Sequence, residues 1–63
     1  MKLKLWCRDE ITAMKLAMSL RAFEKDCARN PYGELVVVDS DNQKVMGHIL
    51  DALFDGRVEE ARG

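Results

Sequence analysis

The first segment of the chain alternates in hydrophobicity with a period of two. One face of Lys2–Cys7 carries the apolar set and the other carries two lysines and a tryptophan; the two sets are Leu3, Leu5 and Cys7, and Lys2, Lys4 and Trp6. A period of two is typical of a strand with one buried face. The pattern therefore predicts a strand whose Trp6 points away from the core.

A long segment without glycine or proline follows this strand. Asp9 is a favourable helix N-cap residue. Glu10–Arg29 is rich in Ala, Leu, Met, Lys and Arg, which are strong helix formers. Asn30 followed by Pro31 should stop the helix. The sequence thus predicts one long helix over about residues 9–29.

The second half of the chain predicts a hairpin. Glu34–Asp39 is centred on four consecutive apolar residues, which is typical of a buried strand. Ser40–Gln43 has the composition of a turn. The segment from Lys44 to about His48 should then be the returning strand.

The end of the chain is ambiguous. Four apolar residues suggest a short helix closed by Gly56 at its C-terminus; they are Ile49, Leu50, Leu53 and Phe54. Alternatively, Asp55–Gly56 forms a hairpin turn into a fourth strand. Residues 59–63 are expected to be a frayed tail. We therefore predict a single α+β domain over residues 1–63, with a β-α-β-β order, a three-stranded, mainly antiparallel sheet and one long helix on one face.

The predicted helix has more apolar surface than one sheet can bury. On a helical wheel, one stripe forms a natural core face: Ala13, Leu16, Ala17, Leu20, Phe23 and Cys27. A second stripe lies nearly opposite and comprises Ile11, Met14, Met18 and Ala22. In the strands, alternation should place Val36 or Val37, and Met46 or Val45, beside Trp6 on the open face of the sheet.

This surplus apolar surface predicts a protein-protein interface, because exposed Met and Trp are enriched at such surfaces. The partner-binding candidates are Trp6, Lys4, Met14, Met18 and Met46. In an alternative arrangement, the C-terminal segment covers one of these patches within the monomer. A homodimer formed through one patch is a third outcome.

Composition narrows the functional classes. The chain has 63 residues, with 10 Lys and Arg against 11 Asp and Glu. This balance argues against non-specific polyanion binding, which needs a basic excess. The sequence has neither a membrane-spanning apolar run nor a hydrophobic signal core, so a cytoplasmic protein is expected. Cys7 and Cys27 are predicted to be free, buried thiols.

No residue pattern in the sequence indicates catalysis. His48 is the single histidine, and Asp51 is its nearest candidate partner for a metal site. Ser19 and Ser40 lack a nucleophile-elbow context, and the glycines are too dispersed to cradle a phosphate. We therefore expect a protein that is not an enzyme and that uses no cofactor or metal.

The start of the chain also resembles a DNA-binding family. A short strand with outward Lys2, Lys4 and Trp6, followed by a helix, resembles the first half of a ribbon-helix-helix repressor. The resemblance covers only residues 1 to about 25, and the second helix of that family is missing because Glu34–Val38 is predicted to be a strand. It implies a dimeric nucleic-acid-associated regulator, which is the alternative function.

The preferred hypothesis is a non-enzymatic protein-binding module. A small intracellular chain with surplus apolar surface could act as an inhibitor or adaptor, of the kind that phages and mobile elements encode. It would sterically block a surface of a larger host protein or complex.

Overall fold

A computed structural model describes residues 1–61 of the chain. Six elements follow one another: β1 (Lys2–Cys7), α1 (Glu10–Phe23), β2 (Ala28–Tyr32), β3 (Leu35–Asp39), α2 (Gln43–Phe54) and β4 (Val58–Glu60). The α+β class is confirmed, but the structure has four strands and two helices where the sequence predicted three strands and one long helix.

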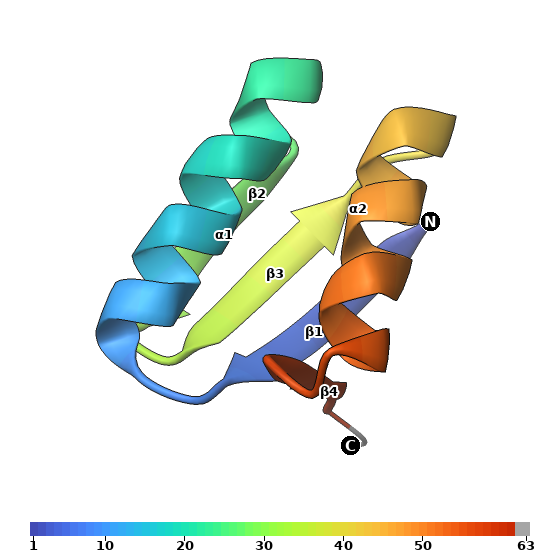
Figure 1. The fold of residues 1–63 in the computed structure, drawn as a ribbon. Coiled ribbons are helices and arrows are strands. Elements are labelled where there is room, and N and C mark those ends of the chain that lie inside the picture. Colours follow the sequence, from blue (N-terminus) through green and yellow to red (C-terminus); the bar gives the residue numbers. More distant parts are fainter. Residues whose placement is uncertain (62–63) are drawn as a thin grey trace.

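The strands form one antiparallel sheet in the order β2-β3-β1-β4. Both helices pack on the same face of this sheet, and the other face is left open (Figure 1). The βαββαβ succession is that of the ferredoxin-like arrangement, which hosts many unrelated functions and assigns none by itself.

The core lies between the helices and the inner face of the sheet. The predicted inward set is largely confirmed, since Leu5 and Cys7 of β1 are buried against Ala13, Leu16 and Leu20 of α1. Val36, rather than Val37, points inward from β3. Both cysteines are free and buried, as predicted.

The first helix is shorter than predicted. It begins after the N-cap Asp9, as expected, but it ends at Phe23. The chain then turns through Asp26, which adopts a left-handed conformation with φ of 63°, and the Cys27 thiol donates a hydrogen bond to the Leu20 carbonyl at 3.3 Å. Residues 28–32 form edge strand β2 instead of the end of a helix.

The predicted hairpin after β3 is wrong, because α2 replaces its returning strand. The Ser40 hydroxyl accepts a hydrogen bond from the Asn42 N–H at 3.0 Å, and the Asn42 side chain caps the helix by accepting one from the Lys44 N–H at 2.9 Å. Helical spacing then buries one stripe of α2, namely Val45, Ile49 and Ala52. The polar stretch at residues 40–43 is therefore a helix start and not a strand-to-strand turn.

The end of the chain combines the two predicted alternatives, because a helix closed by Gly56 is followed by a fourth strand. Gly56 has φ of 75°, and the Arg57 N–H donates to the Ala52 carbonyl at 3.0 Å, which is the backbone pattern of a glycine-terminated helix. Strand β4 takes in residues 59–60 of the predicted tail, and Val58 just before them is buried and pairs with Cys7. Residues 62–63 of that tail lie outside the described residues.

Candidate functional site

The open face of the sheet holds the first group of candidate residues. In the β1–β3 ladder, Trp6 pairs with Leu35 and Lys4 pairs with Val37. Because paired residues in antiparallel strands share a face, all four project away from the helices. The predicted outward orientation of Trp6 is confirmed, since it is 45% exposed while its neighbours Leu5 and Cys7 are buried.

An apolar row crosses three strands of this face. Tyr32 of β2 pairs with Leu35 of β3, which in turn pairs with Trp6 of β1. Leu35 is only 7% exposed although it does not belong to the core cluster under the helices. It therefore forms the shielded centre of the row, with the exposed rings of Tyr32 and Trp6 as its neighbours across the two ladders.

A second row on the same face carries positive charge. Arg29 of β2 pairs with Val37, which pairs with Lys4. The acidic members of the face lie at its margins: Asp39 is near the N-terminal amine at 3.9 Å, and Glu59 pairs with Trp6 on β4. The middle of the face thus presents aromatic rings next to cationic side chains.

Sequence reasoning missed part of this surface. Arg29 was predicted to end a helix and Tyr32 follows the predicted helix stop at Asn30–Pro31, so neither was placed on the face that carries Trp6 and Lys4. The available signal in the sequence was a polar Arg-Asn-Pro-Tyr segment shortly before the Val-rich strand with which it pairs. An edge strand tolerates proline and polar residues because one of its edges faces solvent.

The methionine candidates separate into two environments. Met14 and Met18 are 57% and 62% exposed on the outer side of α1, as the helical wheel predicted. Met46 does not join Trp6, because it lies on α2, where it is half-buried and packs against the core from the helix side. Its predicted place on the open face is wrong because the strand that would have put it there is a helix.

The C-terminal segment covers neither predicted patch. Helix α2 lies beside α1 on the inner face of the sheet (Figure 1), which leaves both Trp6 and the Met14–Met18 stripe exposed. Two apolar residues of this segment are themselves exposed, with Leu50 at 63% and Phe54 at 95%, whereas Leu53 packs against the core. The outer side of the helix layer therefore has an apolar surface of its own.

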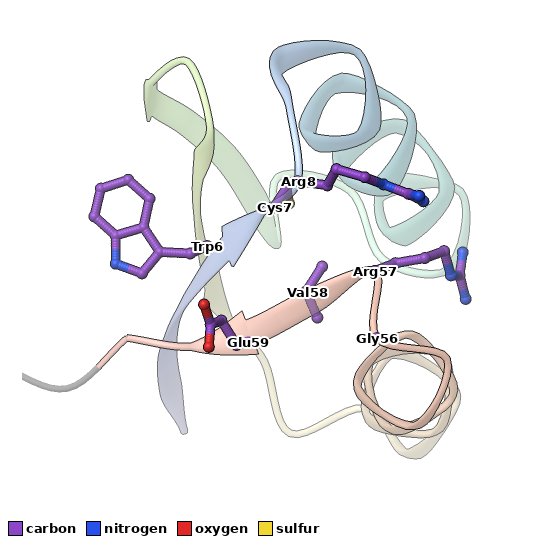
Figure 2. Close-up of a pocket in the computed structure, with 7 residues that line it drawn as sticks. All are labelled: Trp6, Cys7, Arg8, Gly56, Arg57, Val58 and Glu59. Carbon is purple, nitrogen blue, oxygen red and sulfur yellow. The ribbon is translucent and has the colours of Figure 1, made fainter.

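A cavity of about 340 Å³ lies where β1 ends and β4 begins. Figure 2 shows that Trp6 and Glu59 point to one side of this strand pair, whereas Arg8 and Arg57 point to the other. Burial is the main factor that raises the pKa of the Cys7 thiol at this cavity, with Asp9 and Glu34 adding to it. The thiol is consequently protonated at neutral pH and is a weak nucleophile.

His48 and Ser40, which were considered for metal binding and catalysis, make contacts that support the fold. The His48 ring contacts the Phe23 ring, with centroids 5.7 Å apart. The Ser40 hydroxyl accepts a hydrogen bond from the Asn42 N–H at the start of α2. Within residues 1–61, no group of three or more His, Cys, Asp or Glu side chains is placed to hold a metal ion. Nor is any helix in this part of the chain long and apolar enough to cross a membrane.

Comparison with known proteins identified no similar protein or structure. A scan against protein-family models, a search of curated proteins and a search of solved structures each found no match to this chain.

Proposed function

We propose that this protein is a non-enzymatic protein-binding module that docks through the open face of its sheet. The observation that carries the proposal is the row Tyr32–Leu35–Trp6, which crosses three hydrogen-bonded strands and is not covered by either helix. Trp and Tyr are the residues that most often dominate binding energy at interfaces. Trp6 acts as the anchor and Tyr32 as a second contact.

The charges around this row define the complementary partner surface. Lys4 and Arg29 flank the apolar row, so the partner presents an apolar pocket for the indole with carboxylates beside it. Rim charges of this kind speed encounter and set orientation more than they add affinity. Binding would occupy a surface of a larger protein, and the effect on that protein is steric, as expected of an inhibitor or adaptor.

The test begins with affinity capture and then maps the contact. A photo-crosslinking residue at position 6 should form a covalent adduct with a defined protein, and one at position 54 on the helix layer should not. With the partner in hand, Trp6→Ala should weaken binding at least ~30-fold, as expected for an interface anchor.

Phe54→Ala provides the matched control, since it removes an aromatic ring that is 95% exposed on the other side of the molecule. It should leave the dissociation constant within about twofold of wild type, well under 1 kcal/mol. Equal affinities for wild type and Trp6→Ala, or an adduct formed only from position 54, would contradict docking through the sheet.

A second candidate function uses the same face. Exposed aromatic rings beside Lys4 and Arg29 on an open sheet are also suited to single-stranded nucleic acid, whose bases stack on rings while cations follow the phosphates. The paired-ribbon form of a DNA-binding dimer is disfavoured, because β1 is paired on both sides, with β3 and with β4. Any nucleic acid would therefore lie across the sheet.

Salt dependence separates the two functions. Trp6 is the only tryptophan, so its fluorescence reports directly on stacking by an oligonucleotide. Affinity for a single strand should fall steeply with salt, with a logarithmic slope of about −0.7 per phosphate contact. Docking on a protein through the apolar row should change little over the same range. Absence of quenching by oligothymidylate at low salt would eliminate the nucleic-acid candidate.

A further inference from the structure

The helix side of the β1–β4 strand pair holds a groove that is separate from the open sheet face. Its volume is about 220 Å³, and it lies between the first half of α1 and the corner that joins α2 to β4. Three cationic side chains line it, namely Arg8, Lys15 and Arg57. Its apolar lining consists of Leu16, Ala52 and Val58.

One backbone hydrogen bond joins Arg8 to Arg57, and a second joins Arg57 to the last turns of α2. The Arg8 N–H donates to the Arg57 carbonyl at 3.3 Å, and the Arg57 N–H donates to the Ala52 carbonyl at 3.0 Å. Their side chains extend on the same side of the strand pair, away from Trp6 (Figure 2). Two guanidinium groups are thus presented to one groove by fixed backbone positions.

The cations of this groove are poorly neutralised within the protein. Arg57 makes one ion pair, from a terminal nitrogen to Asp55 at 3.2 Å, and its buried Nε has no hydrogen-bond partner within residues 1–61. In the same part of the chain, neither Arg8 nor Lys15 forms an ion pair with a carboxylate. With three cations lining the groove and one carboxylate paired to them, the groove carries excess positive charge, which would attract an anion.

We propose that this groove binds the phosphate group of a small phosphomonoester. Arg57 and Arg8 would donate to the phosphate oxygens, because the planar guanidinium matches phosphate geometry, and Lys15 would add a third positive charge. The apolar lining would contact the organic part of the ligand. The proposal goes beyond the docking face, since Trp6 takes no part in it.

Titration with inorganic phosphate, followed by amide chemical shifts in NMR spectra, tests the anion site. Shifts should be confined to residues around the groove and should not appear with chloride at the same ionic strength. Lys15→Gln and Arg57→Gln should each weaken phosphate binding about tenfold, the usual effect of losing one charge-assisted contact. Lys15 is exposed, so its variant keeps the test valid if Arg57→Gln is unstable.

Matched variants and a second probe complete the test. Lys25→Gln removes the same charge beyond the far end of α1, and it should bind phosphate as wild type does, as should Trp6→Ala. Phenyl phosphate should bind at least about threefold more tightly than inorganic phosphate, because its ring contacts the apolar lining. The proposal is overturned if Lys15→Gln binds like wild type, if Lys25→Gln is equally weakened, or if the ring adds no affinity.

Discussion

The open face of the sheet and the outer side of the helix layer both expose large apolar side chains, but they hold them differently. On the sheet, Trp6 and Tyr32 flank the shielded Leu35 on three strands joined by backbone hydrogen bonds. On the helix layer, Met14 and Met18 project from one helix beyond its buried stripe. The exposed fractions are therefore similar, but the sheet residues are held by three paired strands and the methionines by a single helix.

The difference matters for binding because ordering side chains costs free energy. Tyrosine and tryptophan present large rigid surfaces with few rotatable bonds, whereas methionine loses more rotamer freedom when it is fixed. The sheet face is preorganised for one partner geometry, and the methionine stripe is adaptable. Exposed apolar residues make the sheet face and the methionine stripe both candidate interfaces. The strand pairing that aligns Tyr32, Leu35 and Trp6, and the rigidity of their side chains, favour the sheet face.

The largest difference in stability between the two surfaces is expected at Leu35. Leu35→Ala should lower the free energy of unfolding by about 2 kcal/mol, the low end for a buried leucine, because Leu35 is only 7% exposed. Met18→Ala, which removes a side chain that is 62% exposed, should change it by less than about 0.5 kcal/mol. Urea denaturation of both variants measures this contrast. Equal effects would mean that the sheet face is no better organised than the helix stripe.

The sequence predicted the first strand, the start of α1 and the strand of valines, because local patterns determine these elements. Alternation in β1 and the Asp9 cap act over a few residues, and both are confirmed. The same locality explains why Trp6, Lys4, Met14 and Met18 were correctly placed on exposed surfaces. Candidate residues on correctly predicted elements kept their predicted orientation.

The errors arose where tertiary context overrode local propensity. The turn after α1 is made without glycine, because Asp26 occupies the left-handed position, which aspartate tolerates better than most residues. Because no glycine or proline marks the true end of α1, the predicted helix ran on to Arg29. It therefore included the first residues of β2, and that strand was not predicted. The strand β4 has only three residues, and the sequence indicated a fourth strand only as an alternative to the helix, because its pairing with β1 is a long-range contact. With β2 hidden, Arg29 and Tyr32 were missing from the candidate site.

Substitutions in the methionine stripe of α1 should have a smaller effect on stability. The double variant Met14→Glu/Met18→Glu should stay folded, with a change in unfolding free energy below about 0.5 kcal/mol per site, since both side chains are exposed. It should bind the sheet-face partner as wild type does. Any weak self-association of wild type at high concentration, measured by sedimentation velocity, should disappear in the variant.

The uncharged variant Met14→Gln/Met18→Gln is the matched control for that measurement. It should suppress self-association as well, because the cause is loss of apolar contact and not charge repulsion. A double variant that unfolds would show that the stripe belongs to the core. One that loses the partner would move the docking surface from the sheet to the helix layer.

The smallest expected effect concerns the junction that joins the two regions. Asp9 caps α1 directly after β1, and its carboxylate accepts a hydrogen bond from the Thr12 N–H at 2.7 Å. That backbone bond is the main cause that lowers the pKa of Asp9 below its ordinary 3.8, with the Thr12 side chain next. Since the folded-state pKa is the lower one, the charged cap adds stability that is complete above the unfolded pKa. This stability is lost as the pH falls through the folded value.

Asp9→Asn isolates this titration, because asparagine also caps helices but carries no charge. Wild type should be more stable than Asp9→Asn near neutral pH, and the difference should shrink or reverse in acid, as the pH falls below the ordinary pKa of 3.8 and through the lower folded value. The converse variant is Asn42→Asp at the cap of α2, and it should introduce a pH dependence of the same sign. Urea denaturation midpoints, near neutral pH and in acid, compare wild type with Asp9→Asn and with Asn42→Asp. A wild-type advantage that stays constant with pH would mean that the charge of Asp9 does not hold α1 in place, and that the Thr12 N–H is satisfied equally well by any capping oxygen.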